Sequence, residues 1–182
     1  MMKLFNIILT VLAMMLLVGC DKPKEKSPGE LYEEAQIYLT DIEKNDPVKA
    51  LDILNKVITL DPGSIKAYLS RADAYMSLGE NEKAFEDFNT AIQLNPDAPD
   101  IYLKRGEIYS DLKQYEKALK DFNHAIRLKP NFANAYFERG KIYFATGVYN
   151  KALEDFTTAL RIDPNHTKAG LYIDEVRPLL LK

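Results

Sequence analysis

The side chains of this sequence that could do chemistry are few and scattered. The 182 residues contain one cysteine, Cys20, and two histidines, His124 and His166. One cysteine cannot form an internal disulfide or share a metal site with a second cysteine. The histidines have no regular spacing to each other or to a carboxylate cluster, and the sequence has no catalytic-triad motif or phosphate-binding glycine loop. We therefore expect no catalytic residue, no metal site and no cofactor, and we do not predict an enzyme.

Cys20 ends a run of apolar residues. From Leu4 to Val18 the chain holds fifteen residues that are interrupted only by Asn6 and Thr10. A helix that spans a membrane needs about 20 apolar residues, whereas the apolar core of a secretory signal peptide takes about 7–15. The run therefore predicts an export signal. The alternative is a buried cysteine in a membrane-anchoring helix.

The end of this run, LVGC at residues 17–20, resembles the lipobox of bacterial lipoprotein precursors. The resemblance implies that residues 1–19 form a signal peptide that is cleaved before Cys20. It also implies a diacylglycerol thioether on the Cys20 thiol and an acyl group on the new amine. Two or more such chains hold a protein stably on a membrane. Residues 20–29 are charged and contain prolines, so they are expected to form the lipidated N-terminus and a flexible linker.

The same resemblance predicts a lipid anchor on a bacterial cell membrane, with the protein facing the periplasm or the cell exterior. Asp21 resembles the inner-membrane retention signal of enteric bacteria, which favours the inner membrane and leaves the outer membrane open. The net charge of −3 comes from acidic and basic residues that are interleaved along the chain. Because no clustered basic stripe is present, we expect no nucleic-acid partner.

Several residue types recur every 34 positions. They form three columns: Pro62, Pro96, Pro130 and Pro164; Ala50, Ala84, Ala118 and Ala152; and Leu54, Phe88, Phe122 and Phe156. Within each unit, apolar residues recur at helical spacing in two segments that a short polar or glycine-containing turn separates. The proline closes the second segment because it cannot continue a helix. Each unit is therefore predicted to be a pair of helices.

This pattern resembles the tetratricopeptide repeat, whose period is 34 residues. The resemblance implies an all-α fold, a right-handed superhelical solenoid of helix-turn-helix repeats with a C-terminal capping helix. The predicted units are a degenerate repeat at 30–62, clear repeats at 63–96, 97–130 and 131–164, and the capping helix at 165–182. The degenerate repeat fits if extra residues lie in the turn near 43–46. Pro178 should end or kink the capping helix.

Charged and aromatic columns share the same period. The charged columns are Arg71, Arg105 and Arg139, and Asp87, Asp121 and Asp155. We expect each arginine to pair with the aspartate of its own unit, because a partly buried arginine usually has a partner. The alternative is an arginine row for an acidic ligand. The tyrosine columns, Tyr68, Tyr102 and Tyr136, and Tyr75, Tyr109 and Tyr143, should pack inside with their hydroxyls in solvent, whereas His124 should face outward.

The resemblance also implies a concave groove, lined by the first helices, that binds a protein or peptide. The candidate groove residues are Leu69, Asp73, Met76, Leu103, Lys104, Glu107, Phe137, Lys141, Phe144 and Leu171. An apolar row beside mixed charge suits an extended or helical peptide. The alternative is that part of the row Leu69, Leu103, Phe137 and Leu171 packs against neighbouring helices. Chaperone-binding members use a carboxylate clamp, and the residues at its positions differ here: Leu69, Asp73, Lys104, Asn134 and Glu138.

Taken together, these features predict a non-enzymatic, membrane-anchored adaptor of the bacterial cell envelope. Its partners would be a protein or peptide in the groove and the membrane, which it reaches through the lipid on Cys20. Two other functions stay open. One is a pilotin-like escort or assembly factor for a secretion or pilus complex. The other is a sensor or accessory of peptidoglycan enzymes. The sequence also leaves a homo-oligomer open.

The lipid attachment gives a first prediction. Cys20→Ser should remove the thiol that carries the diacylglycerol and leave an uncut or slowly processed precursor. Metabolic labelling with a fatty-acid analogue should mark the wild-type protein and leave the variant unlabelled. Label retained in the variant would remove the lipoprotein interpretation.

Overall fold

The structure, a computed structural model, describes residues 25–41 and 45–181. The predicted signal peptide, the lipid on Cys20 and the sorting residue Asp21 lie outside this part of the chain. Residues 42–44, which overlap the expected extra residues near 43–46, also lie outside it. No helix in the two described ranges is long and apolar enough to cross a membrane.

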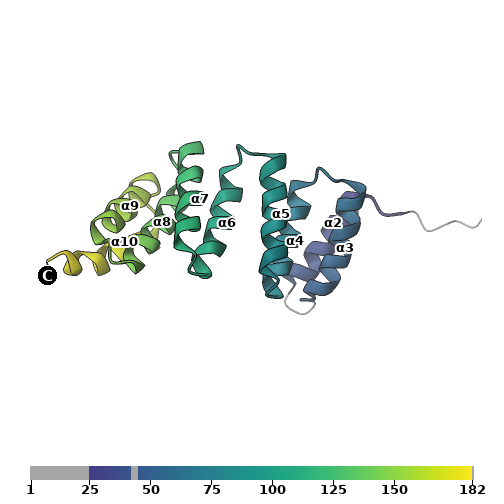
Figure 1. Ribbon diagram of the computed structural model, residues 1–182, viewed down its shortest axis with the longest axis horizontal. Helices are drawn as coiled ribbons and strands as arrows, with labels where there is room; N and C mark the ends of the chain where they lie inside the picture. The colour runs from purple at the N-terminus through teal and green to yellow at the C-terminus, as the bar shows by residue number, and fades with distance from the viewer. Residues whose placement is uncertain (1–24, 42–44, 182) are drawn as a thin grey trace, which may run out of the picture.

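The described residues fold into helices that pair along the chain. The elements are α2 (Pro28–Thr40), α3 (Pro47–Leu60), α4 (Ile65–Ser77), α5 (Asn81–Leu94), α6 (Pro99–Asp111), α7 (Tyr115–Leu128), α8 (Ala133–Ala145), α9 (Tyr149–Ile162), α10 (Thr167–Val176) and the 3₁₀ helix η1 (Arg177–Leu180). The main contacts join α2 to α3, α4 to α5, α6 to α7 and α8 to α9. Figure 1 shows these pairs stacked in one row, with α2 and α3 at one end and α10 at the other. The predicted all-α solenoid of helix pairs is confirmed.

Helix ends follow from local residues. Ser27 forms a capping box with Glu30: the Glu30 amide donates to Ser27 Oγ at 3.3 Å, and the Ser27 amide donates to Glu30 Oε2 at 2.8 Å. Such a box satisfies amides that the first turn of a helix leaves free. At the other end of the chain, α10 stops at Val176 and continues as the 3₁₀ turn that contains Pro178. Pro178 therefore ends the α-helix, as predicted.

The turn inside each of three consecutive pairs needs a left-handed backbone. Gly79 and Gly147 have φ of 76°, and Lys113 stands at the equivalent place with φ of 57°. The left-handed region costs a residue with a Cβ roughly 1–2 kcal/mol, and glycine avoids this cost. The central pair therefore carries a strained turn where its neighbours carry glycine.

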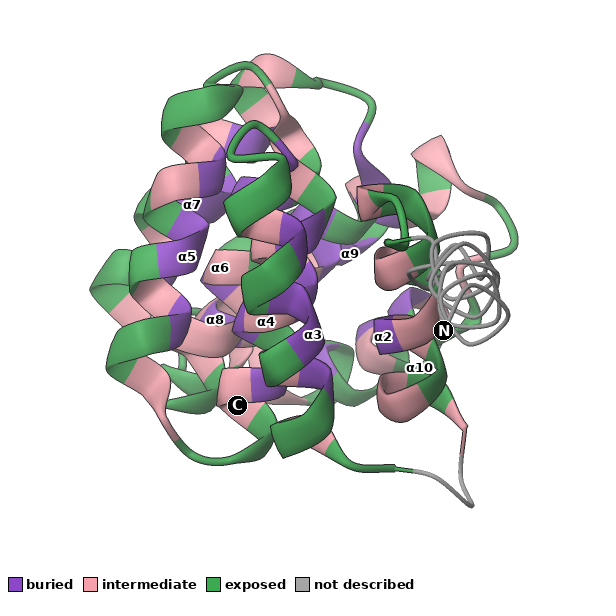
Figure 2. Ribbon diagram, turned by 90° about the vertical axis from the view of Figure 1, so that its right-hand side faces the viewer, coloured by how far each residue is buried: buried purple, intermediate pink, exposed green. Residues whose placement is uncertain are grey.

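The two helices of a pair approach closely because a small residue faces a phenylalanine. A Cβ placed on Gly106 would lie 2.6 Å from Phe122 Cε1, and one on Gly140 would lie 2.7 Å from Phe156 Cε1. Both rings are fully buried. Figure 2 shows that the buried residues lie on the sides of the helices that face one another, with exposed residues outside. The ring of the second helix thus fills the space that the missing side chain leaves.

Each arginine of the charged column binds two helices besides its own. Arg105 Nε donates to Asp121 Oδ2 at 2.8 Å, and Nη2 donates to Asp121 Oδ1 at 2.7 Å. Its Nη1 donates to Asn89 Oδ1, which belongs to the preceding unit, at 2.6 Å. The same arrangement joins Arg71 to Asp87 and Asn55, and Arg139 to Asp155 and Asn123. The predicted ion pair within each unit is confirmed.

The aspartates of these pairs are almost fully buried. Burial raises the pKa of Asp155 above its ordinary value, against the opposing effect of the Arg139 hydrogen bonds. A buried carboxylate of this kind is tolerated because the guanidinium holds both of its oxygens. The column of Asn55, Asn89 and Asn123, whose members are also 34 residues apart, completes the arrangement and was not singled out from the sequence.

Two predictions about side-chain exposure need correction. His124 does not simply face outward, because it is half-buried and its ring stacks on Tyr102 at 4.1 Å between centroids. Tyr102 does not send its hydroxyl into solvent, since the hydroxyl donates to the Pro96 carbonyl at 3.1 Å. His166 caps the N-terminus of α10, where its Nδ1 accepts a hydrogen bond from the Ala169 amide.

The glycine–phenylalanine packing can be tested with two identical substitutions. Gly106→Ala should lower the free energy of unfolding by about 1–3 kcal/mol, because the new methyl group would overlap the Phe122 ring. Gly170→Ala in α10 is the matched control, since a Cβ there has no neighbour within 4 Å. Alanine is the better helix former by about 1 kcal/mol, so this variant should be at least as stable as the wild type. Urea denaturation measures both, and equal midpoints would contradict the packing.

Candidate functional site on the concave face

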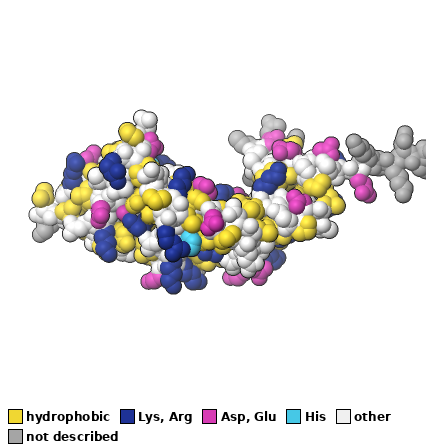
Figure 3. Space-filling model, turned by 90° about the horizontal axis from the view of Figure 1, so that it is seen from above, with side chains coloured by type: hydrophobic (Ala, Val, Ile, Leu, Met, Phe, Trp, Pro, Cys, Tyr) yellow, Lys and Arg dark blue, Asp and Glu magenta, His cyan; other side chains and the backbone are white. Residues whose placement is uncertain are grey.

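The first helices of the units line the inner side of the stack. Helix α2 contacts α4, and α6 contacts α8, whereas the second helices of the described units make no comparable contacts with one another. Helices that approach more closely lie on the inside of a curve, so the first helices and α10 form the concave face. Figure 3 shows the molecule from above, with its outline hollowed along one long side.

The apolar row of the predicted groove is largely core. Leu103 and Phe137 retain only 7% and 5% of their surface. Leu103 belongs to the buried cluster that contains Phe122. The Phe137 ring lies 5.7 Å from the ring of Phe156 and 5.5 Å from that of Tyr172, between centroids. The structure thus corrects the groove assignment of Leu103 and Phe137, which pack against neighbouring helices instead.

The other apolar candidates keep part of their surface. Leu69 and Met76 on α4 are half-buried, and so is Phe144 on α8. The Phe144 ring meets that of Tyr172 edge-on at 5.6 Å between centroids, so α8 and α10 share an aromatic contact. Leu171 is 65% exposed, but it lies at the C-terminal end of the stack, beside α9. The accessible apolar surface of the groove therefore comes from α4 and from the α8–α10 contact.

Charged residues occupy the middle of the concave face. Lys104 on α6 donates to Asp73 on α4 at 3.0 Å, which links consecutive units. Lys141 donates to Glu138 on the same helix at 2.7 Å. Burial, together with the nearby Glu138, raises the pKa of Glu107 above its ordinary value, against the opposing effects of Lys141 and Lys104. The four predicted polar residues, Asp73, Lys104, Glu107 and Lys141, are thus brought together with Glu138 in one strip.

Two residues of this surface were not among the predicted groove residues. Glu138 holds Lys141, and Tyr172 contacts both Phe137 and Phe144. Glu138 lies three residues before the predicted groove residue Lys141, a spacing that places two side chains on the same helix face. Tyr172 follows Glu138 by 34 residues and takes the same position in α10. The repeat register could therefore have identified both.

The arrangement suits binding of a chain segment. Half-buried apolar side chains lie on both sides of a strip of paired charges, and extended or helical peptides are held on such surfaces by apolar anchors and polar contacts. Within residues 25–41 and 45–181, no group of three or more histidine, cysteine, aspartate or glutamate side chains is placed to hold a metal ion.

Family models match most of the helical region. A model described as a TPR repeat matches residues 72–113 and 106–147, and a model of the tetratricopeptide repeat matches residues 133–166. Together the matches span 72–166, more than half of the 182 residues. No curated protein sequence matches the chain.

Solved structures share the fold over most of the chain. A crystal structure of MamA is 27% identical with a TM-score of 0.68, and the match covers 85% of this chain and 86% of that one. The first TPR of Spaghetti (RPAP3) bound to the HSP90 peptide SRMEEVD is 23% identical with a TM-score of 0.61, covering 67% and 97%. YrrB, a TPR protein with an unusual peptide-binding site, is 22% identical with a TM-score of 0.62, covering 81% and 74%. The last two show similarity of fold alone.

The raised pKa of Glu107 predicts a dependence of stability on pH. A carboxyl whose pKa is raised in the folded state stabilises the fold below its unfolded pKa, near 4.5, and this contribution is lost as the pH rises through the folded pKa. Glu107→Gln should therefore be more stable than the wild type at pH 7, by a few tenths of a kcal/mol because the group is partly solvated. The two proteins should be equal at pH 4. Thermal unfolding at both pH values measures the difference, with Glu116→Gln on α7 as the control. A variant less stable at pH 7 would show that the two lysines outweigh burial.

Proposed function

Because this chain belongs to the tetratricopeptide repeat family, we propose that it is a non-enzymatic adaptor that binds a partner protein or peptide on its concave face. We propose further that Cys20 carries the lipid that anchors it to a bacterial cell membrane, where it acts in the envelope. The observation that supports the binding function is the strip of charged residues on the concave face. It places the paired charges of α4, α6 and α8 beside the exposed parts of Leu69, Met76 and Phe144.

The peptide-bound relatives support this choice of face. RPAP3 is described with an HSP90 peptide, and YrrB with a peptide-binding site, on a fold that this chain shares. The partner proposed here has a different chemistry from a chaperone tail. Asp73 and Glu138 place carboxylates where chaperone-binding members hold a terminal carboxylate with amide and basic side chains, and like charges in contact disfavour binding.

The membrane anchor is supported by the sequence before α2. The lipobox resemblance ends at Cys20, and a charged segment separates it from the helix cap at Ser27. Ten residues of extended chain reach about 35 Å at most, at ~3.5 Å per residue. The repeats would then work close to the membrane surface without being inserted in it. Fatty-acid labelling of the wild type and Cys20→Ser tests this part independently of partner binding.

The binding face can be tested by charge reversal in cells. A photo-crosslinking residue at position 76 of the full chain should capture a partner that lies along the concave face. Lys104→Glu replaces the inter-unit ion pair with like charges and should lower the yield of the crosslinked product about tenfold or more. It should leave the thermal midpoint nearly unchanged, since exposed ion pairs contribute about 0–1 kcal/mol.

The control carries the same charge change on the convex side. Lys120 is exposed on α7, the second helix of the same unit, and Lys120→Glu should keep the full crosslink yield. Full crosslink yield from both variants would exclude the concave face as the binding surface. A loss with both would indicate a general electrostatic effect rather than a binding site.

A further inference from the structure

Helix α10 stands in the place of a first helix, and within residues 25–41 and 45–181 it is followed only by the 3₁₀ helix η1. Its sequence continues the 34-residue register, so that Gly170, Ile173 and Asp174 follow Tyr136, Arg139 and Gly140 of α8. In α8, Arg139 binds Asp155 on α9, and Gly140 lies against Phe156 on α9. The corresponding side of α10 has no second helix of its own to face in the described residues.

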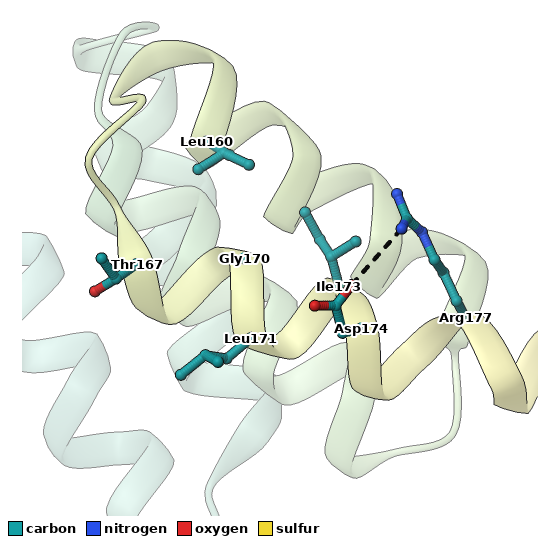
Figure 4. A pocket seen from close by; sticks show the side chains of 7 residues that line it. All are labelled: Leu160, Thr167, Gly170, Leu171, Ile173, Asp174 and Arg177. Atoms are coloured by element: carbon teal, nitrogen blue, oxygen red, sulfur yellow. Dashed lines mark ion pairs between the residues drawn. The ribbon is translucent and has the colours of Figure 1, made fainter.

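A cavity of about 450 Å³ occupies that side of α10. It is lined by residues that in earlier units face or flank the second helix, together with one residue of α9: Leu160, Thr167, Gly170, Leu171, Ile173, Asp174 and Arg177. Figure 4 shows these side chains around the space between α10 and the end of α9. Leu160 corresponds to Ile92, which packs against the buried cluster that contains Phe122 on the second helix of the next unit. The cavity is therefore the space that a further second helix would fill.

The surface around this cavity is apolar and open. Leu171, which lines the cavity, is 65% exposed, more than any other large apolar side chain of the described helices. A Cβ added at Gly170 would meet nothing within 4 Å, so the helix surface is flat and open at this point. Such a face is costly to leave in water and gains from being covered.

The helix that covers this face must differ from the second helices α7 and α9. Those two helices present an aspartate to an arginine and a phenylalanine to a glycine. Here the arginine is replaced by Ile173 and the glycine by Asp174, so an aspartate would lose its partner and a phenylalanine its space. Because Ile173 is already buried in the cluster that contains Phe156, the open face requires apolar side chains opposite Leu171 and a cation opposite Asp174.

We propose that a second copy of this chain supplies the missing helix, with the two α10 helices packed antiparallel across a two-fold axis. First and second helices joined by a short turn run antiparallel, so the partner's α10 would run as a second helix does. Asp174 and Arg177 lie on the same face, three residues apart and paired at 3.6 Å. When the two-fold axis passes beside residues 175 and 176, at the C-terminal end of α10, Asp174 of one copy lies beside Arg177 of the other, twice by symmetry. Leu160 and Leu171 of each copy form the apolar centre, whereas Ile173 beneath them is already buried in the cluster that contains Phe156.

The proposed interface is small. It joins two ten-residue helices and the end of α9, so it falls at the low end of the range of specific interfaces, where association is weak and depends on concentration. Sedimentation velocity of the full chain in a non-ionic detergent, from ~1 µM to ~500 µM, should show a monomer that converts to a dimer.

Charge reversal tests the register of the two helices. Asp174→Arg would place two arginines beside each other at both contacts, and Arg177→Asp would place two aspartates there. Each variant alone should dimerise at least about tenfold more weakly than the wild type. A mixture of the two variants should form a heterodimer, because each contact then joins an arginine to an aspartate. Both residues are more than two-thirds exposed, so neither change should shift the thermal midpoint appreciably.

Two further variants test the apolar centre and the specificity. Leu171→Glu should also weaken dimerisation, whereas Lys120→Glu on α7 should leave it unchanged. A monomer at all concentrations, a dimer that the single variants do not weaken, or a mixture that fails to pair would each overturn the proposal. A monomeric chain that binds an added amphipathic peptide at α10 would also overturn it and would assign the face to another protein. These measurements do not involve the concave-face partner, so they succeed or fail independently of the proposed function.

Discussion

The stack from α4 to α9 depends on one arginine in each unit that reaches in two directions. The guanidinium of Arg105 holds both oxygens of Asp121 within its unit and the amide oxygen of Asn89 in the unit before. The first contact fixes how the two helices of a pair lie, and the second fixes how that pair meets its neighbour. Because the aspartate is nearly fully buried, losing the arginine would leave an uncompensated charge, a much larger penalty than the loss of a surface pair. Close packing of Phe122 on Gly106 follows from this alignment and reinforces it.

The concave face follows from the same alignment. Lys104 on α6 reaches Asp73 on α4. Leu103 is covered by the cluster that it shares with Phe122 of α7, and Phe137 by Phe156 of α9 and Tyr172 of α10. The row of apolar residues therefore stabilises the stack in its middle and becomes accessible at Leu171 on α10. What the middle of the face offers a partner is a strip of charges beside half-buried Met76 and Phe144. Stability and recognition thus use the same helices and different side chains.

The 34-residue register predicted the helix pairs and the arginine–aspartate bonds because these depend on contacts within one unit. The exposure of Leu103 and Phe137 could not be predicted in the same way, since it depends on how closely consecutive units approach. The stacking of His124 on Tyr102 is likewise a contact that the spacing of residue types does not encode. The asparagine column was visible in the sequence, but its role required knowing where Arg105 Nη1 points. Lipid attachment at Cys20 rests on the sequence alone, outside the described residues.

The arginine bonds also bear on how such a chain can change in length over evolution. Each arginine bonds to residues sixteen positions before and sixteen positions after it, so both partners lie within about half a repeat on either side. A whole unit can therefore be duplicated or deleted between existing ones while every arginine still meets an aspartate and an asparagine. The series ends where the sequence changes, with Thr157 in the asparagine column and Ile173 in the arginine column. The concave face can consequently lengthen or shorten by whole units without any change in the arginine, aspartate and asparagine contacts of the remaining units. The sequence of α10, which lacks the arginine, has to stay at the end of the series.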